Sequence, residues 1–462
     1  MNRSVNHVIR IGTALIAIVI LLAPALWNRF PILEYDTGGY LARWFEGYLV
    51  PSRSTVYGLF LVSGWPLDFW PVAILQAAAA VWILSYVFRA HGLGERPFTF
   101  LLIMALLSAM TALAWNASML LTDIFVGLAV LALYLLVFKS DRFEIWERAA
   151  LVGFVGFATS THSATFLVAL GLAVVALLVS FVDRMRVPRV AALQAAAGVA
   201  LGAVMLLTAN YVMAKRIAWT PGGYGIVFAR MLEDGIVARY LDEHCADLRF
   251  KLCPYRKTLP PTADDFLWGE SVFNDFGRFD GMGEEMRTIV LESLAAYPLT
   301  QIKAALAAAA KQLVMVKTGE GVINEIWHTY GMMEMYTPSV LPAMRAARQQ
   351  QGKLHFEAIN AVHVPVALLG TAFLPILVFL YAWRRTNADL GHLAATAALA
   401  IVINAFVCGP LSNAHDRYGA RIVWIAPFVM LLSSLQRFRP AVDTRPQAQN
   451  LAAMKAGPVP SG

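Results

Sequence analysis

The sequence predicts an all-α membrane protein that crosses a bilayer about ten times and carries a mainly helical domain outside the membrane. Of its 462 residues, 58% are hydrophobic and only 15% are charged, whereas soluble chains carry roughly 25% charged residues. Many apolar runs approach the ~20 residues that one crossing needs. These observations exclude a disordered chain, a collagen, a small disulfide scaffold and a DNA-binding domain.

The distribution of positive charge predicts the orientation. The net charge is +7 and the pI about 9.3, but the basic residues lie mostly in short segments between apolar runs, which does not indicate a nucleic-acid partner. With both termini in the cytoplasm, sixteen Lys and Arg face inward, and the short outside segments hold five: Arg29, Arg43, Arg53, Arg417 and Arg421. This bias follows the positive-inside rule, and we expect a bacterial inner membrane with a periplasmic domain.

The predicted order is an N-terminal membrane region at 1–213 with a first outside loop at 28–68, an outside domain at 214–361, a C-terminal membrane region at 362–439 and a disordered cytoplasmic tail at 440–462. The first apolar run lacks an A-x-A cleavage site, so we expect a retained anchor. The predicted spans are 9–27, 69–89, 97–115, 119–138, 148–161, 163–182, 190–213, 362–383, 392–409 and 421–436.

The fifth span is unusually short. A helix of about 14 residues rises only about 21 Å, against a hydrocarbon core of about 30 Å. A single helix over 149–182 would place a basic segment outside, so we predict two helices with a break near Thr159-Ser160-Thr161-His162-Ser163. Backbone that leaves a helix at that depth must face protein or water, and we therefore expect the break to line a cavity.

The outside domain begins with a turn-rich stretch and is nearly neutral in charge. After Pro298, five apolar residues fall on one helical stripe: Ile302, Leu306, Ala309, Leu313 and Val316. A helix on the bilayer surface and an ordinary amphipathic core helix are both consistent with this pattern.

Two of the three cysteines, Cys245 and Cys253, lie eight residues apart in the outside domain. An oxidising compartment favours a disulfide between them. A metal site that adds His244 stays an alternative, although two Cys and one His do not form a zinc-finger pattern.

Carboxylates stand where two predicted spans meet the outside. Glu34 and Asp36 follow the first span, and Asp123 lies at the start of the fourth. Asp36 and Asp123 could simply cap helices. Alternatively, carboxylates at the same membrane face can take a proton from a hydroxyl, divide acid and base roles, or hold a divalent metal.

Cationic residues form the other half of the candidate site. His415, Arg417 and Arg421 precede the last predicted span, and His162 lies in the predicted break. Capping and snorkelling explain such residues structurally. Guanidinium groups also bind phosphate bidentately, and we expect these residues to face an anionic lipid phosphate.

Several of these motifs together resemble those of the GT-C glycosyltransferases, which include the protein O-mannosyltransferases and the lipid A aminoarabinose transferases. The motifs are Glu34-Tyr35-Asp36-Thr37-Gly38-Gly39-Tyr40, the run from Pro51 to Tyr57 with Arg53, Thr122-Asp123, and His415-Asp416-Arg417-Tyr418. This sequence departs from the adjacent acidic pair of many members, because Tyr35 separates its two acids.

The resemblance implies inverting transfer of a sugar from a polyprenyl-phosphate donor, held in membrane lipid, to an extracytoplasmic acceptor. Asp36 and Asp123 would be catalytic, with Asp36 as the general base. The remaining site residues would bind substrate: Glu34, Tyr40, Arg53, His162, His415, Arg417 and Arg421. The resemblance implies no certain cofactor, and a divalent metal stays an alternative.

Three other functions compete with this one. An O-antigen ligase or polymerase would rely on Arg and His rather than on Asp36. A lipid or sugar transporter should show midplane charges and repeated halves, whereas this sequence has few midplane charges and no repeat. The third alternative is a non-catalytic subunit of an envelope assembly.

Overall fold

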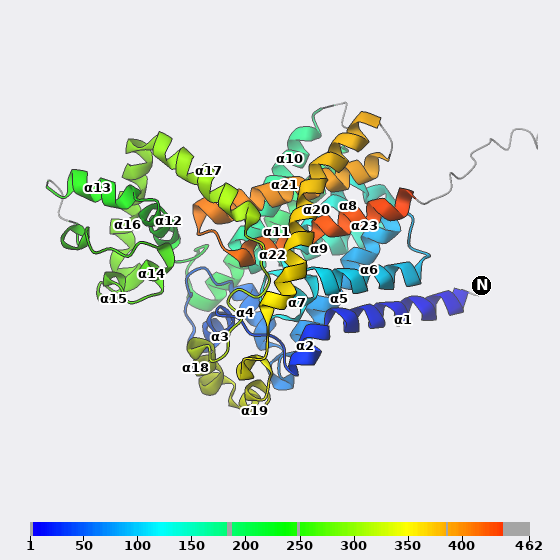
Figure 1. Ribbon diagram of the computed structural model, residues 1–462, viewed down its shortest axis with the longest axis horizontal. Helices are drawn as coiled ribbons and strands as arrows, with labels where there is room; N and C mark the ends of the chain where they lie inside the picture. The colour runs from blue at the N-terminus through cyan, green and yellow to red at the C-terminus, as the bar shows by residue number, and fades with distance from the viewer. Residues whose placement is uncertain (1–2, 183–186, 247–249, 385–386, 438–462) are drawn as a thin grey trace, which may run out of the picture.

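The computed structural model describes residues 3–182, 187–246, 250–384 and 387–437, and within these ranges it is helical without any β-strand (Figure 1). Helices account for 76% of the structure. The prediction of an all-α protein is confirmed. The predicted tail at 440–462 lies outside the described residues.

Five helical stretches are long and apolar enough to cross a membrane. They are α5 (Trp70–Ala90), α11 (Arg189–Ala214), α20 (Phe356–Arg384), α21 (Ala388–Leu411) and the consecutive helices α22 (Asp416–Val423) and α23 (Ile425–Arg437). Shorter apolar helices accompany them: α1 (Arg3–Leu21), α6 (Pro97–Met110), α8 (Ile124–Phe138) and α10 (Ser163–Val179). The structure is compatible with a multi-pass membrane protein, and the count of about ten crossings stays a prediction.

We call the bundle that contains these candidate spans the membrane part. Helix α8 lies at its centre. Every residue from Ile124 to Val137 is buried, and the helix is surrounded by α5, α9 (Ile145–Thr161), α10, α11, α21 and α22. A uniformly apolar helix is typical of such a fully enclosed position. The packing is tight, since a Cβ added at Gly127 would lie 2.5 Å from the Trp424 ring.

The predicted helix break is confirmed. Helix α9 ends at Thr161, α10 begins at Ser163, and His162 between them has an extended backbone, with φ −157° and ψ 134°. Ser160 and Ser163 on either side line a small hollow of about 10 Å³ together with Ser52, Arg53, Ser54, Leu206, Trp219 and Thr220.

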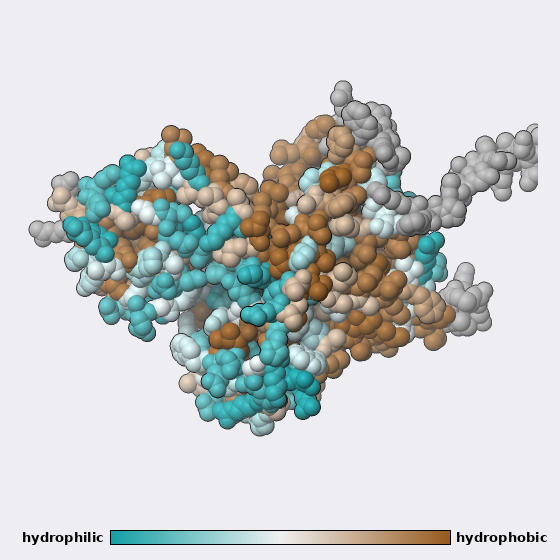
Figure 2. All heavy atoms as spheres, viewed as in Figure 1, coloured by the Kyte–Doolittle hydropathy of each residue, from teal (hydrophilic) through white to brown (hydrophobic). Residues whose placement is uncertain are grey.

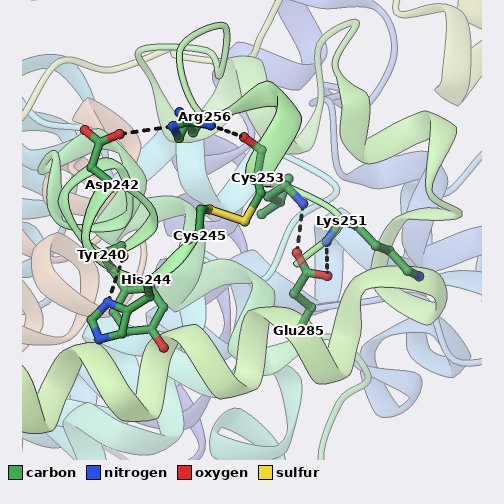
Figure 3. The surroundings of a disulfide bond; sticks show 9 residues. Tyr240, Asp242, His244, Cys245, Lys251, Cys253, Arg256 and Glu285 are labelled. Atoms are coloured by element: carbon green, nitrogen blue, oxygen red, sulfur yellow. Dashed lines mark hydrogen bonds and ion pairs between the residues drawn. A yellow bond between two sulfur atoms is a disulfide. The ribbon is translucent and has the colours of Figure 1, made fainter. Parts of the chain in front are cut away.

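A smaller lobe stands apart from the membrane part, at the left of Figure 1. It comprises α12 (Gly223–Glu233), α13 (Ile236–His244), α14 (Ala263–Leu267), α15 (Val272–Asp275) and α16 (Arg278–Ala296), which bury a hydrophobic core of their own. Cys245 after α13 and Cys253 are joined by a disulfide, with the sulfur atoms 2.07 Å apart (Figure 3). Beside it, both carboxylate oxygens of Glu285 accept backbone N–H groups, those of Lys251 and Leu252.

Helix α17 (Pro298–Val314) connects this lobe to the membrane part. The apolar stripe predicted for it is buried in one part and exposed in another. Ala309 is buried, whereas Ile302 and Leu306 are exposed, and Val316 follows the end of the helix. The chain then passes through α18 (Trp327–Tyr336) and α19 (Leu341–Arg345), whose buried residues join the membrane part's core. The segment predicted as one outside domain, 214–361, therefore contributes to two hydrophobic cores.

Short helices of the N-terminal half complete this end of the molecule: α2 (Ala23–Asn28), α3 (Thr37–Glu46), α4 (Thr55–Val62) and α7 (Leu113–Ser118). Helix α3 packs against α4 and α18. The first loop, which carries α3 and α4, therefore contacts the segment around residue 330.

Candidate functional site

Backbone pairing brings two of the predicted acidic motifs together. Ile32 and Met119 form an isolated parallel bridge, in which the Ile32 N–H donates to the Ser118 carbonyl and the Leu120 N–H donates to the Ile32 carbonyl, both at 2.9 Å. The Thr37 hydroxyl adds a hydrogen bond to the Leu120 carbonyl at 3.1 Å. The first loop and the segment before α8 therefore run side by side, and each ends in an aspartate at the start of a helix.

A third segment fixes the first loop from the other side. The Gln349 side chain accepts the Leu33 N–H at 3.0 Å and donates to the Leu33 carbonyl at 2.7 Å, and its own backbone N–H donates to Asn28 Oδ1 at 2.7 Å. All three residues are buried. These bonds give the short irregular loop a fixed path, because nearly all its backbone groups near Glu34 have a defined partner.

Arg417 lies among all three acidic residues predicted from the sequence. Its Nη1 forms an ion pair with Glu34, its Nη2 lies 3.0 Å from Asp36 Oδ2, and its Nε lies 3.6 Å from Asp123 Oδ2. The structure thus brings residues from both ends of the chain into one cluster. A guanidinium group suits this position because its donors point in several fixed directions within one plane.

Asp36 has a second cationic partner, Arg53, with which it forms an ion pair. Arg53 precedes Ser54, the N-cap of α4, whose hydroxyl accepts the N–H groups of Val56 and Tyr57. Its guanidinium carbon lies 5.9 Å from the centre of the buried Tyr40 ring. Two arginines from opposite ends of the chain therefore flank one carboxylate.

Arg421 lies deeper and is fully buried. Its Nη2 donates to Asn404 Oδ1 at 2.9 Å and to Cys408 Sγ at 3.1 Å, while its Nη1 lies 3.8 Å from Asp123 Oδ1. Within the described residues, Nη1 and Nε of Arg421 and Oδ2 of Asp123 have no hydrogen-bond partner. Buried polar atoms without partners are uncommon in native structures, and here three of them gather next to Arg417.

Capping does not explain the two aspartates. Asp36 occupies the N-cap of α3 and Asp123 the N-cap of α8, but neither side chain accepts a capping hydrogen bond. Both carboxylates turn toward the arginines instead. Of the two interpretations of these residues, the structure favours a shared charged cluster.

The two predicted histidines have different surroundings. His162 lies close enough for the charges of Asp36, Arg53, Arg417 and Arg421 to act on it, and its Nδ1 accepts the Ala164 N–H at 3.2 Å. His415 faces away from these carboxylates, with Nδ1 2.9 Å from Glu320 Oε1 and Nε2 3.4 Å from Asp264 Oδ2. Both nitrogens of His415 are therefore engaged, and this arrangement does not support the predicted contact with phosphate.

The two first-loop acids differ in protonation. Burial raises the pKa of the Glu34 carboxyl to about 8, although the Arg417 guanidinium opposes part of this shift. Burial also favours neutral Asp36, but Arg53 and Arg417 outweigh it and hold the pKa of Asp36 below its ordinary range. The arginines thus favour the ionised form of Asp36, whereas burial shifts Glu34 toward its protonated form, and this difference suits two different roles.

Accessibility also differs among the three carboxylates. The Asp36 side chain is 13% exposed, whereas those of Glu34 and Asp123 are each 2% exposed. Asp36 is therefore the most accessible of the three acids. In the described part of the chain, no group of three or more His, Cys, Asp and Glu side chains is arranged to hold a metal ion.

A second hollow lies elsewhere. It measures about 180 Å³, is almost entirely apolar, and is lined by Leu133, Tyr134, Val137 and Phe138 near the far end of α8 together with residues of α10, α11 and α21. Since it lacks the charged groups found at the start of α8, we take the Arg417 cluster as the candidate site.

Glu320 and Asn404 were missed from the sequence. Glu320 accepts the Arg417 N–H at 2.7 Å, and Asn404 Oδ1 accepts a hydrogen bond from Arg421 at 2.9 Å. The sequence held one sign that Glu320 lies in a tightly packed turn, because it stands between two glycines. Gly321 has φ +78°, and a Cβ there would overlap Glu34 Oε1.

Comparison with known proteins adds no assignment. No protein-family model matches the chain, and no curated protein or solved structure matches it either.

Proposed function

We propose that this protein is a membrane glycosyltransferase that moves a sugar from a polyprenyl-phosphate donor to an acceptor on the extracytoplasmic side, in a bacterial inner membrane. The observation that carries the proposal is the contact of Arg417 with Glu34, Asp36 and Asp123 in one partly enclosed cluster. The cluster supplies both a carboxylate for a hydroxyl proton and guanidinium groups for a phosphate. Apolar helices around it provide the setting for a lipid-linked donor.

Asp36 is the general base in this proposal. The acceptor hydroxyl attacks the anomeric carbon, the carbon–oxygen bond to phosphate breaks, the phosphate leaves with the bonding electrons, and Asp36 takes the hydroxyl proton. Attack from the side opposite the phosphate inverts the anomeric configuration. Asp36 suits this role because it is ionised and is the most accessible of the three acids.

Arg417 and Arg53 bind the leaving phosphate, and their present pairing with Asp36 has a consequence for the base. When a phosphate pairs with either guanidinium group, it neutralises part of the positive charge that holds the pKa of Asp36 low. Asp36 then becomes a stronger base in the donor complex than in the free protein. Arg421 lies too deep for this contact and instead supports Asp123.

The test uses purified protein in vesicles with a radiolabelled polyprenyl-phosphate sugar and an extract of envelope acceptors. Since general-base catalysis contributes roughly 10²–10⁴ in rate, Asp36→Asn should lower transfer by that order while the protein still folds and inserts. Asp280→Asn, at an exposed position of α16, is the matched control and should keep full activity.

Two outcomes would favour a function other than this glycosyltransferase activity. If Asp36→Asn transfers normally while Arg417→Ala and His415→Ala do not, the protein acts as a ligase or polymerase of the O-antigen type. Absence of transfer by the wild-type protein with every lipid-linked sugar tested would reject catalysis and favour an assembly subunit.

A further inference from the structure

Helix α17 presents an apolar stripe that no described part of the protein covers. Leu299, Ile302 and Leu306 are 73%, 55% and 53% exposed, and their spacing of three and four residues places them along one face. Leu291 and Leu294, at the end of the preceding helix α16, are exposed as well. Contiguous exposed apolar side chains of this kind indicate a surface that contacts something other than water.

The C-terminal part of α17 packs against a candidate membrane span. Ala308, Ala309 and Gln312 are buried, and α17 makes extensive contact with α21. The approach is close, since a Cβ added at Gly409 of α21 would lie 2.6 Å from the Ala308 carbonyl oxygen. The end of α17 is therefore fixed against α21 through small residues.

The stripe continues the apolar surface of the membrane part. Helix α21 has exposed apolar side chains of its own at Val402, Phe406 and Leu411, on a helix long and apolar enough to cross a bilayer. In Figure 2, hydrophobic atoms follow the upper edge of the smaller lobe, where Figure 1 draws α17, toward the hydrophobic membrane part. This continuity selects lipid as the occupant of the stripe.

Charge beside the stripe agrees with a lipid surface. Lys303 and Lys311 are exposed on α17, and Lys303 directly follows Ile302 on the edge of the apolar face. Lysines that flank the apolar face of a surface helix contact anionic headgroups while their carbon stems cover apolar surface.

We propose that α17 and the end of α16 lie in the membrane interface on the side of the Arg417 cluster, with Leu291, Leu294, Leu299, Ile302 and Leu306 in contact with lipid chains. The smaller lobe is thereby attached to the bilayer as well as to the protein. This proposal does not depend on the glycosyltransferase assignment.

The attachment is linked directly to the candidate site. Gln312, at the end of α17, accepts the His415 N–H at 3.0 Å and donates to the His415 carbonyl at 2.8 Å. Just beyond the helix, the Lys317 N–H donates to Asp416 Oδ1 at 2.9 Å. Lipid contact along α17 therefore steadies the segment that carries Arg417.

Site-directed spin labelling tests the lipid contact without any assay of function. Single cysteines replace Ile302 or Leu306 in the full chain, which is labelled with a nitroxide in vesicles of phosphatidylcholine and phosphatidylglycerol. Cys408 is buried and the other two cysteines are bridged, so unmodified protein reports background labelling. Glu284→Cys, on an exposed polar position of α16, is the matched control.

Lipid contact predicts that oxygen accessibility relative to that of a water-soluble nickel chelate is several-fold higher at 302 and 306 than at 284. Equal ratios at the three positions, or nickel accessibility at 302 as high as at 284, would overturn the proposal. Dipolar broadening at 302 that disappears on dilution with unlabelled chains would also overturn it, because a second copy would then cover the stripe.

Discussion

Arg417 and Arg230 are both largely buried, but they differ in where their partners come from. Arg230 pairs with Glu233 and Asp234 of its own helix, and its third contact is Asn413. Arg417 pairs with residues 383, 381 and 294 positions away (Glu34, Asp36 and Asp123). Pairs within one turn or so of a helix form as the helix forms, whereas the Arg417 cluster exists only when the whole fold is assembled. The difference separates a local stabilising pair from a site that several segments build together.

The largest expected effect tests this difference directly. Arg417→Ala should lower the free energy of unfolding by about 3–5 kcal/mol, because removing one partner of a buried ion pair leaves uncompensated charge. Arg230→Ala should cost less, about 1.5–3 kcal/mol, since Glu233 and Asp234 are 19% and 15% exposed and regain some water, whereas Glu34 and Asp123 are each 2% exposed. Thermal unfolding in detergent or vesicles compares the two variants, and equal losses would contradict the distinction.

The disulfide should matter to the smaller lobe alone. Opening a loop of this length costs about 2.5 kcal/mol on the chain-entropy account. Cys245→Ser with Cys253→Ser should therefore expose the lobe to limited proteolysis, while the helices from α18 onward stay protected. If the membrane part became equally sensitive, the two cores would not be independent.

A smaller effect is expected at Gly321. Ala at φ +78° is strained, and its Cβ would also displace Glu34, so Gly321→Ala should cost about 1–3 kcal/mol. Gly352 has φ +66° and open space around it, so Gly352→Ala measures the backbone strain alone. Equal losses of unfolding free energy in the two variants would show that the Glu34 contact adds nothing.

The last expected effect depends on pH. Burial favours neutral His415, but its hydrogen bonds to Asp264 and Glu320 outweigh this and raise the pKa of the ring to about 9. Since the unfolded value is near 6.5, the folded protein binds the proton more tightly. The stabilisation is complete below about pH 6.5 and is lost as pH rises through about 9.

His415→Gln should therefore reduce the melting temperature at pH 6 and have little effect above pH 9. His355→Gln, at an exposed histidine, is the control and should show no such trend. A constant difference between wild type and His415→Gln across this range would argue against a charged His415.

Much of this arrangement was predictable because the relevant signals are local. The apolar runs predicted the helices, and the shortness of one run predicted the break at His162. The predicted span at 119–138 begins instead at Ile124, because residues 118–120 pair with the first loop. The span at 97–115 divides between α6 and α7. In the first case a tertiary contact overrides an apolar pattern.

The partners that hold the site could not be predicted in the same way. Gln349 is an ordinary residue in a run of glutamines, and only its two bonds to Leu33 reveal its role. His415 was expected to face a phosphate, and in the structure its two ring nitrogens contact carboxylates from other segments, those of Asp264 and Glu320. Spacing along one sequence carries no information about such distant pairs.

The distance along the chain between Asp36 and Arg417 also has a consequence for biosynthesis. The three acids are made first, and the guanidinium group that balances them arrives only with the final helices. A chain interrupted before residue 417 would contain the carboxylates without their main counterion. Quality control in the membrane could thus distinguish a finished chain from an unfinished one by unbalanced acidic charge near the bilayer.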